Sequence, residues 1–367
     1  AASDVYKRQD PQYTGRPSGS LCMRHAVISA AQKGGIGMKK STGKISIQKA
    51  IAAVMGTALL AGWIFTADRG IGSQEKKIYR EAVEQQGLVD KLGFSGFRLE
   101  EYPVAMYDGK ADYVFYQGKI ENRSPVLETF AGTAYPVGDH YEVIVPTLER
   151  FDGLLSLAGG VEGMVSGSGY GGEEQIATIW HEGLHAWQMS HFQILGENLT
   201  PAEMEKELEQ SGNENGDSEE TLLVKELDQN AEQKKRMKKE MQLLKTAAEK
   251  KDIDGMKAAI LEYREQQEKR QENMSAEALM AEKRCELTEG TAYYVEGNVL
   301  KALRGENVYR ERYLDTLDVF EGGRGKFYRT GMAKCLILDR LEPDWKTGLD
   351  FTESLDELLY KAVESTL

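Results

Sequence analysis

The chain has 367 residues, with 59 acidic side chains, 46 basic side chains and a formal net charge of −13. Nine of the basic and two of the acidic residues precede Asp68, so the remaining 300 residues hold 37 basic and 57 acidic side chains, a net charge of −20. So acidic a surface repels nucleic acid and anionic headgroups, which excludes nucleic acid as a partner. About 300 residues suffice for one two-lobed enzyme with a sizeable core.

The N-terminal segment predicts a membrane anchor. The opening AASDVYKRQ resembles translated adapter sequence, so residues 1–37 are interpreted as a non-native leader, with Met38 as the expected start. Four lysines follow, and then residues 50–67 carry no charge, which is just enough to span a bilayer. Because the positive flank stays in the cytoplasm, everything after Asp68 should lie outside the cell. A cleaved signal peptide is the alternative, although Phe65 fits an A-x-A-like cleavage site poorly.

Residues 68–195 are expected to form the first part of the folded domain. Ile78 to Leu92 predicts a helix, and a second helix is expected at about 173–192. Between them, short runs rich in β-branched and aromatic residues alternate with glycine-containing turns, which is typical of a small mixed sheet. These runs lie at 102–107, 113–116 and 141–145.

The second helix contains an H-E-x-x-H motif, from His181 to His185. Two histidines four residues apart lie on one face of a helix, so both imidazoles can bind one zinc ion. Glu182 can then act as a general base toward a water molecule. Of the five histidines in the chain, three fall between 181 and 191, which favours a zinc site over a solvated helix surface.

A catalytic zinc needs a third protein ligand and an open position for water. His191 is six residues past His185, about 240° further round the helix, so it points elsewhere. The better candidates lie on a helix predicted to begin at 276 and to run to about 303. There Glu289 opens a Glu-Gly-Thr-Ala run, and Glu286 lies one turn earlier on the same face.

Together these motifs resemble those of the gluzincin metallopeptidases, which include thermolysin-like and alanyl-aminopeptidase-like enzymes. Those enzymes pair H-E-x-x-H with a glutamate on a later helix, which in the aminopeptidase branch opens an E-G-x-A run followed by aromatic residues. The resemblance implies a sheet before the motif helix, His181, His185 and Glu289 as zinc ligands, and Glu182 as the base. It covers only the two motif helices, and 104 positions separate His185 from Glu289, far more than in those families. Glu286 therefore stays a rival ligand.

Residues 196–275 account for the long spacing between the ligands. They are rich in Glu, Lys and Gln and predict an inserted helical arm, by default a solvated hairpin on which the core does not depend. Its apolar seam is too broken to favour a partner-binding coiled coil. Residues 276–367 then form the helical C-terminal part of the domain. Cys285 and Cys335 either form a disulfide outside the cell or remain buried thiols.

Two other motif interpretations fail. The E-x-x-H within the zinc motif would need a second copy to build a di-iron bundle, and the chain has none. Residues 167–172 match G-x-G-x-x-G, but a dinucleotide site needs a preceding strand and an acidic residue about twenty positions on. A flexible glycine loop beside the metal cleft is the favoured interpretation.

The sequence therefore predicts an α+β, membrane-anchored, extracytoplasmic zinc peptidase that acts on peptides or proteins. Zinc would polarise the scissile carbonyl, and Glu182 would take the water proton and pass it to the leaving amine. Tyr328, Tyr293 and Arg329 are candidates to stabilise the oxyanion. Three alternatives stay open: a zinc hydrolase of non-peptide amides, an inactive metal-binding surface protein that uses the arm, and a structural coiled-coil protein with an accidental motif. The oligomeric state is left open.

Overall fold

The part of the chain that the computed structural model describes comprises residues 71–94, 96–151, 170–197, 200–204 and 219–365. The interpreted leader, the expected anchor at 50–67 and the first three residues of the glycine loop lie outside it. Among the described residues, no helix is both long enough and apolar enough to cross a membrane.

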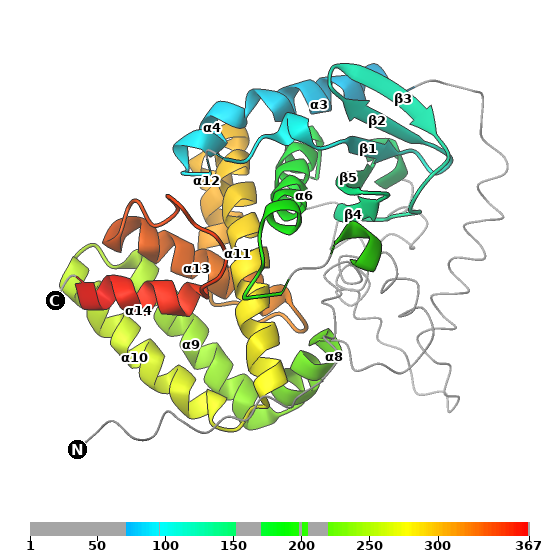
Figure 1. Cartoon of the computed structure of the whole chain (residues 1–367). Helices are drawn as coiled ribbons and strands as arrows, with labels where there is room; N and C mark the ends of the chain where they lie inside the picture. Colours follow the sequence, from blue (N-terminus) through cyan, green and yellow to red (C-terminus); the bar gives the residue numbers. More distant parts are fainter. Residues whose placement is uncertain (1–70, 95, 152–169, 198–199, 205–218, 366–367) are drawn as a thin grey trace, which may run out of the picture.

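The fold is α+β, as expected, with one mixed five-stranded sheet ahead of the motif helix and a helical lobe after it (Figure 1). The strands are β1 (Val104–Tyr107), β2 (Asp112–Tyr116), β3 (Lys119–Arg123), β4 (Thr133–Val137) and β5 (His140–Pro146). Their order across the sheet is β3-β2-β1-β5-β4. Only β1 and β5 run parallel, and the other neighbours are antiparallel.

The two edge strands were not predicted from the sequence. Almost every side chain of β3 is exposed, so its sequence lacks the apolar alternation of a half-buried strand. Strand β4 contains Pro136, which has no N–H to donate to a ladder and is therefore tolerated at a sheet edge. Central β1, β2 and β5 carry the buried apolar residues that made them predictable.

The named helices of the described residues include those expected from the sequence, together with further elements that were not predicted. They are α3 (Ser73–Glu84), α4 (Gln86–Lys91), η2 (Leu99–Glu101), α6 (Gly172–His191), α8 (Glu219–Leu223), η3 (Val224–Asp228), α9 (Ala231–Glu249), α10 (Ile253–Gln271), α11 (Ala276–Arg304), α12 (Glu306–Tyr309), η4 (Arg310–Leu314), α13 (Gly325–Leu341) and α14 (Leu355–Ser365). Helices α6 and α11 contain the two motifs, and α14 was not predicted.

Helix α6 lies between the sheet and α11, contacting β5 and β4 on one side and α11 on the other (Figure 1). Its apolar side chains Ile176, Ile179 and Ala186 are buried. Gly183 has no room for a side chain, because a Cβ there would lie 3.0 Å from the Phe97 ring and 2.9 Å from a methyl of Leu99. The indole of Trp180 donates to the carbonyl of Ala82, 2.9 Å away, which fixes α6 against α3.

Helices α11 and α13 touch backbone to backbone at a pair of glycines. A Cβ on Gly331 would lie 2.5 Å from the carbonyl oxygen of Glu286 and 2.6 Å from the Cα of Gly290. Only glycine at both positions allows this approach. The glycine of the Glu-Gly-Thr-Ala run therefore fixes where α11 crosses α13, and with it the position of Glu289 one residue earlier.

The expectation of a solvated arm is wrong. Helices α9 and α10 pack together, and α9 also packs on α13, so apolar side chains of both helices belong to the main core (Figure 1). These side chains are Leu243, Leu244, Ala247, Met256, Ala259, Ile260 and Tyr263. The sequence did not reveal this buried face, because some of the charged residues of these helices form buried ion pairs. The guanidinium of Arg270 donates to Glu240 at 2.8 Å and to Glu282 at 2.6 Å and 2.7 Å, with all three side chains buried.

The two cysteines of the helical lobe, Cys285 on α11 and Cys335 on α13, are both free and buried. Burial also raises the pKa of the Cys335 thiol far above its usual range. The structure thus has buried thiols in place of the alternative disulfide.

Truncating a buried arm side chain should destabilise the whole protein. Leu244 is 1% exposed, so Leu244→Ala should cost about 2–5 kcal/mol of unfolding free energy. The neighbouring Gln242 is exposed, and Gln242→Ala should change stability by less than about 0.5 kcal/mol. Urea unfolding of both variants makes the comparison. Equal midpoints would restore the view that the arm is dispensable.

Candidate metal centre

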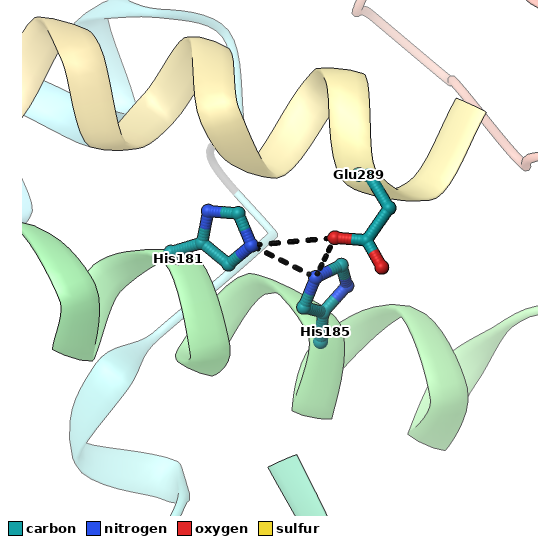
Figure 2. Close-up of side chains that lie close together, drawn as sticks. All are labelled: His181, His185 and Glu289. Atoms are coloured by element: carbon teal, nitrogen blue, oxygen red, sulfur yellow. Dashed lines mark hydrogen bonds and ion pairs between the residues drawn. The ribbon is translucent and has the colours of Figure 1, made fainter. Parts of the chain in front are cut away.

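Helices α6 and α11 bring together the three residues expected to bind zinc (Figure 2). Nε2 of His185 lies 3.1 Å from Nε2 of His181 and 3.1 Å from Oε2 of Glu289. The third separation, from His181 Nε2 to Glu289 Oε2, is 3.5 Å. All three side chains are buried, and they form the one group of three or more potential metal ligands found among the described residues.

These separations fit a metal ion. Zinc binds histidine nitrogen and carboxylate oxygen at about 2.0–2.2 Å in a tetrahedral arrangement, so two of its ligand atoms lie about 3.3 Å apart. The observed separations between the three candidate ligand atoms, 3.1–3.5 Å, lie on either side of that expected distance. Two nitrogens and one oxygen form a donor set that suits zinc and leave a fourth corner open.

A glutamine orients the second histidine. Nδ1 of His185 lies 3.0 Å from Oε1 of Gln188. The Gln188 amide nitrogen donates to the Thr291 hydroxyl at 2.8 Å, and that hydroxyl donates to the carbonyl of Leu287, so the amide oxygen must face His185. Nδ1 therefore donates, and in the neutral ring Nε2 presents a lone pair to the cluster.

A glutamate one helical turn beyond the motif approaches the first histidine. Glu296 Oε2 lies 2.8 Å from His181 Nδ1. Because this oxygen does not lie in line with the ring N–H, the contact is an ion pair and not a hydrogen bond. The hydroxyl of Tyr313 donates to the other oxygen of Glu296 at 2.8 Å. Glu296 and Gln188 were not predicted from the sequence. Helical periodicity would have found both, because Gln188 lies three residues after His185 and Glu296 seven after Glu289.

The electrostatics of the cluster favour a positive charge at its centre. Burial alone would raise the pKa of Glu289, but His185 and His181 hold it well below its usual range. Burial alone would lower the pKa of His181, but Glu289 and Glu296 hold it well above its usual value. A buried carboxylate and two converging lone pairs need a cation between them, either a proton or a metal ion.

Glu286 and His191 lie apart from this group. Oε2 of Glu286 pairs with Nζ of Lys334, 2.5 Å away, on the α13 side of α11. His191 Nδ1 lies 3.2 Å from the carbonyl oxygen of Trp187 and 3.3 Å from the hydroxyl of Tyr102. Neither residue joins the cluster of ligand atoms, so Glu289 remains the candidate third ligand.

Glu182 lies on the sheet side of the centre, beside the start of β4. A Cβ on Gly132 would lie 2.6 Å from the Thr178 methyl, 3.0 Å from Cγ of Glu182 and 3.2 Å from its Oε1, so a larger residue at 132 would crowd both side chains. Burial raises the pKa of Glu182, and the two nearby histidines partly offset that effect. A raised pKa suits a base that must accept a proton near neutral pH.

The three candidate oxyanion donors differ in position. The ring of Tyr328 stacks on the ring of His181, with centroids 5.7 Å apart and planes 15° from parallel. Tyr293 lies behind it, edge-on to Tyr328 at 5.7 Å. Arg329 is paired with Glu321 at 2.9 Å. Of the three, Tyr328 is the one whose ring contacts a candidate metal ligand.

Comparisons with models of protein families, with curated proteins and with solved structures gave no match for this chain. The metal centre must therefore be interpreted from its own geometry.

Removing one ligand should remove the metal. Protein purified with zinc should hold about one equivalent after dialysis, and His185→Ala should hold none, because two ligands bind zinc too weakly. His191→Ala, on the same helix but outside the cluster, should keep the full equivalent. Elemental analysis by mass spectrometry measures both. Full zinc content in His185→Ala would contradict the assignment.

Proposed function

We propose that the protein is a zinc-dependent peptidase, similar in its centre to the gluzincins. The observation that carries the proposal is the convergence of Glu289 with both histidines of H-E-x-x-H across 104 residues of chain. An accidental motif would not be expected to meet a buried third ligand at zinc-binding distances. The N-terminal anchor predicted from the sequence would place this peptidase outside the cell.

The residues of the centre would have distinct roles in hydrolysis. His181, His185 and Glu289 would hold the metal, and zinc would supply a Lewis acid that lowers the pKa of water and polarises the scissile carbonyl. Glu182 accepts the proton of the attacking water and then delivers it to the nitrogen of the leaving amine. Tyr328, stacked beside His181, is the candidate donor to the oxyanion.

The sheet supports a peptide substrate over a small amide. Strand β4 is the last strand in the sheet order, so among the described residues its outer edge has no neighbouring strand. It runs beside α6, and a Cβ on the residue before it, Gly132, would lie 3.0 Å from Cγ of Glu182. An extended peptide that adds to this edge by main-chain hydrogen bonds would pass the general base.

Replacing the base should separate catalysis from metal binding. Glu182→Gln should keep one equivalent of zinc but lose about 10²–10⁴-fold in kcat, because an amide cannot accept the water proton. Glu173→Gln, an exposed position on the first turn of the same helix, is the matched control and should keep full activity. Cleavage of a mixed peptide library, followed by mass spectrometry, gives the rates. A Glu182→Gln protein as active as the control would contradict the role of Glu182 as the general base.

A further inference from the structure

An arginine lies against the third ligand on the side away from the histidines. Arg324, which immediately precedes α13, is only 4% exposed. Its Nη1 lies 3.4 Å from Oε1 of Glu289, whereas Oε2 of the same carboxylate faces His181 and His185 (Figure 2). The guanidinium therefore contacts the oxygen that is not directed at the metal position.

Helix α8 of the arm contacts this arginine. Glu219, the first residue of α8, places Oε2 3.7 Å from Nη2 of Arg324. Its other oxygen pairs with Arg284, which lies on α11 five residues before Glu289. Arg284 also pairs with Glu197, just after α6, at 2.6 Å. Glu219 thus bridges an arginine of the α13 turn and an arginine of the ligand helix.

A second arm residue holds the turn that carries Arg324. Oδ2 of Asp228, at the end of η3, accepts from the backbone N–H of Gly323 at 2.6 Å. Oδ1 of Asp228 pairs with the buried Nζ of Lys326 at 3.0 Å. Gly323 has φ +64°, a left-handed conformation that glycine adopts without strain. Asp228 of the arm therefore binds the turn at positions 323 and 326, before and after Arg324.

We propose that Arg324 is a positioning residue for the metal ligand Glu289, and that Glu219 and Asp228 of the arm raise the metal affinity by holding Arg324 in place. The inference rests on the metal centre of the proposed function, not on the reaction that the centre performs.

Two effects of Arg324 on metal binding oppose each other. Its contact fixes the carboxylate with a single oxygen toward the metal, whereas its charge repels a bound cation. Glu219 offsets that repulsion, because its carboxylate faces the same guanidinium. Removal of the arginine would leave Oε1 of Glu289 without this buried donor, so the orienting effect should dominate. Partners of metal ligands typically contribute about 10–100-fold to affinity.

The test is zinc affinity, measured by competition with a chromophoric chelator in the absence of substrate. Arg324→Met should lose about 10–100-fold in affinity, and Glu219→Gln about threefold or more. Arg324→Lys keeps the charge but not the forked donor geometry, so its affinity should fall between those of Arg324→Met and the wild type. The visible spectrum of the cobalt-substituted variants should shift as Glu289 changes its coordination.

Glu240→Gln is the matched control. Glu240 is a buried arm glutamate that pairs with Arg270 and lies outside the group of candidate ligands, so Glu240→Gln tests whether the loss of any buried arm carboxylate lowers the zinc affinity. Its zinc affinity and cobalt spectrum should equal those of the wild type. If Arg324→Met does not fold, Glu219→Gln and Arg324→Lys decide the outcome.

Wild-type affinity in Glu219→Gln and Arg324→Lys, or an equal loss in Glu240→Gln, would overturn the proposal. A wild-type protein that binds zinc but cleaves no peptide would count against the peptidase function alone. A wild-type protein that binds no zinc would overturn both.

Discussion

The burial of two imidazoles and a carboxylate between α6 and α11 is the constraint that the surrounding residues must satisfy. Such a group is costly in a protein interior unless a positive charge occupies it and each ligand has a second partner. Gln188, Glu296 and Arg324 provide those partners, one for each ligand. The fold thus fixes not only which residues meet but also which atom of each faces the centre.

Glycine determines how closely the supporting helices approach. The contact of Gly290 with Gly331 sets the crossing of α11 and α13, and Gly183 lets α6 pack on Phe97 and Leu99. Gly132 leaves room for the carboxylate of Glu182 at the start of β4. These glycines lie beside residues of the proposed centre or at contacts of the helices that contain those residues. A methyl group at any of these positions would therefore displace residues of the centre as well as destabilise the protein.

The sequence was sufficient to predict the elements whose signals are local. The α+β class, the central strands, α6 and α11 all follow from apolar periodicity and from motif spacing. Edge strands β3 and β4 could not be predicted, because exposure and Pro136 remove the apolar alternation. The packing of the arm could not be predicted either, since the sequence alone does not distinguish Arg270, Glu240 and Glu282 from residues of a solvated surface, and only their mutual pairing shows that they are buried. For the candidate metal centre, the motifs predicted the three candidate ligands, but the choice between Glu286 and Glu289 needed the position of Lys334.

The arm lengthens the chain between the ligands without separating them in space. Its helices α9 and α10 pack into the core, and Glu219 of α8 reaches the arginines around Glu289. The central claim is that these distant segments build one zinc site. Anomalous diffraction at the zinc absorption edge, from crystals of the zinc-loaded protein, tests it most directly. The account predicts one peak about 2.0–2.2 Å from Nε2 of His181, Nε2 of His185 and an oxygen of Glu289. A zinc peak elsewhere, or none between these three atoms, would contradict it.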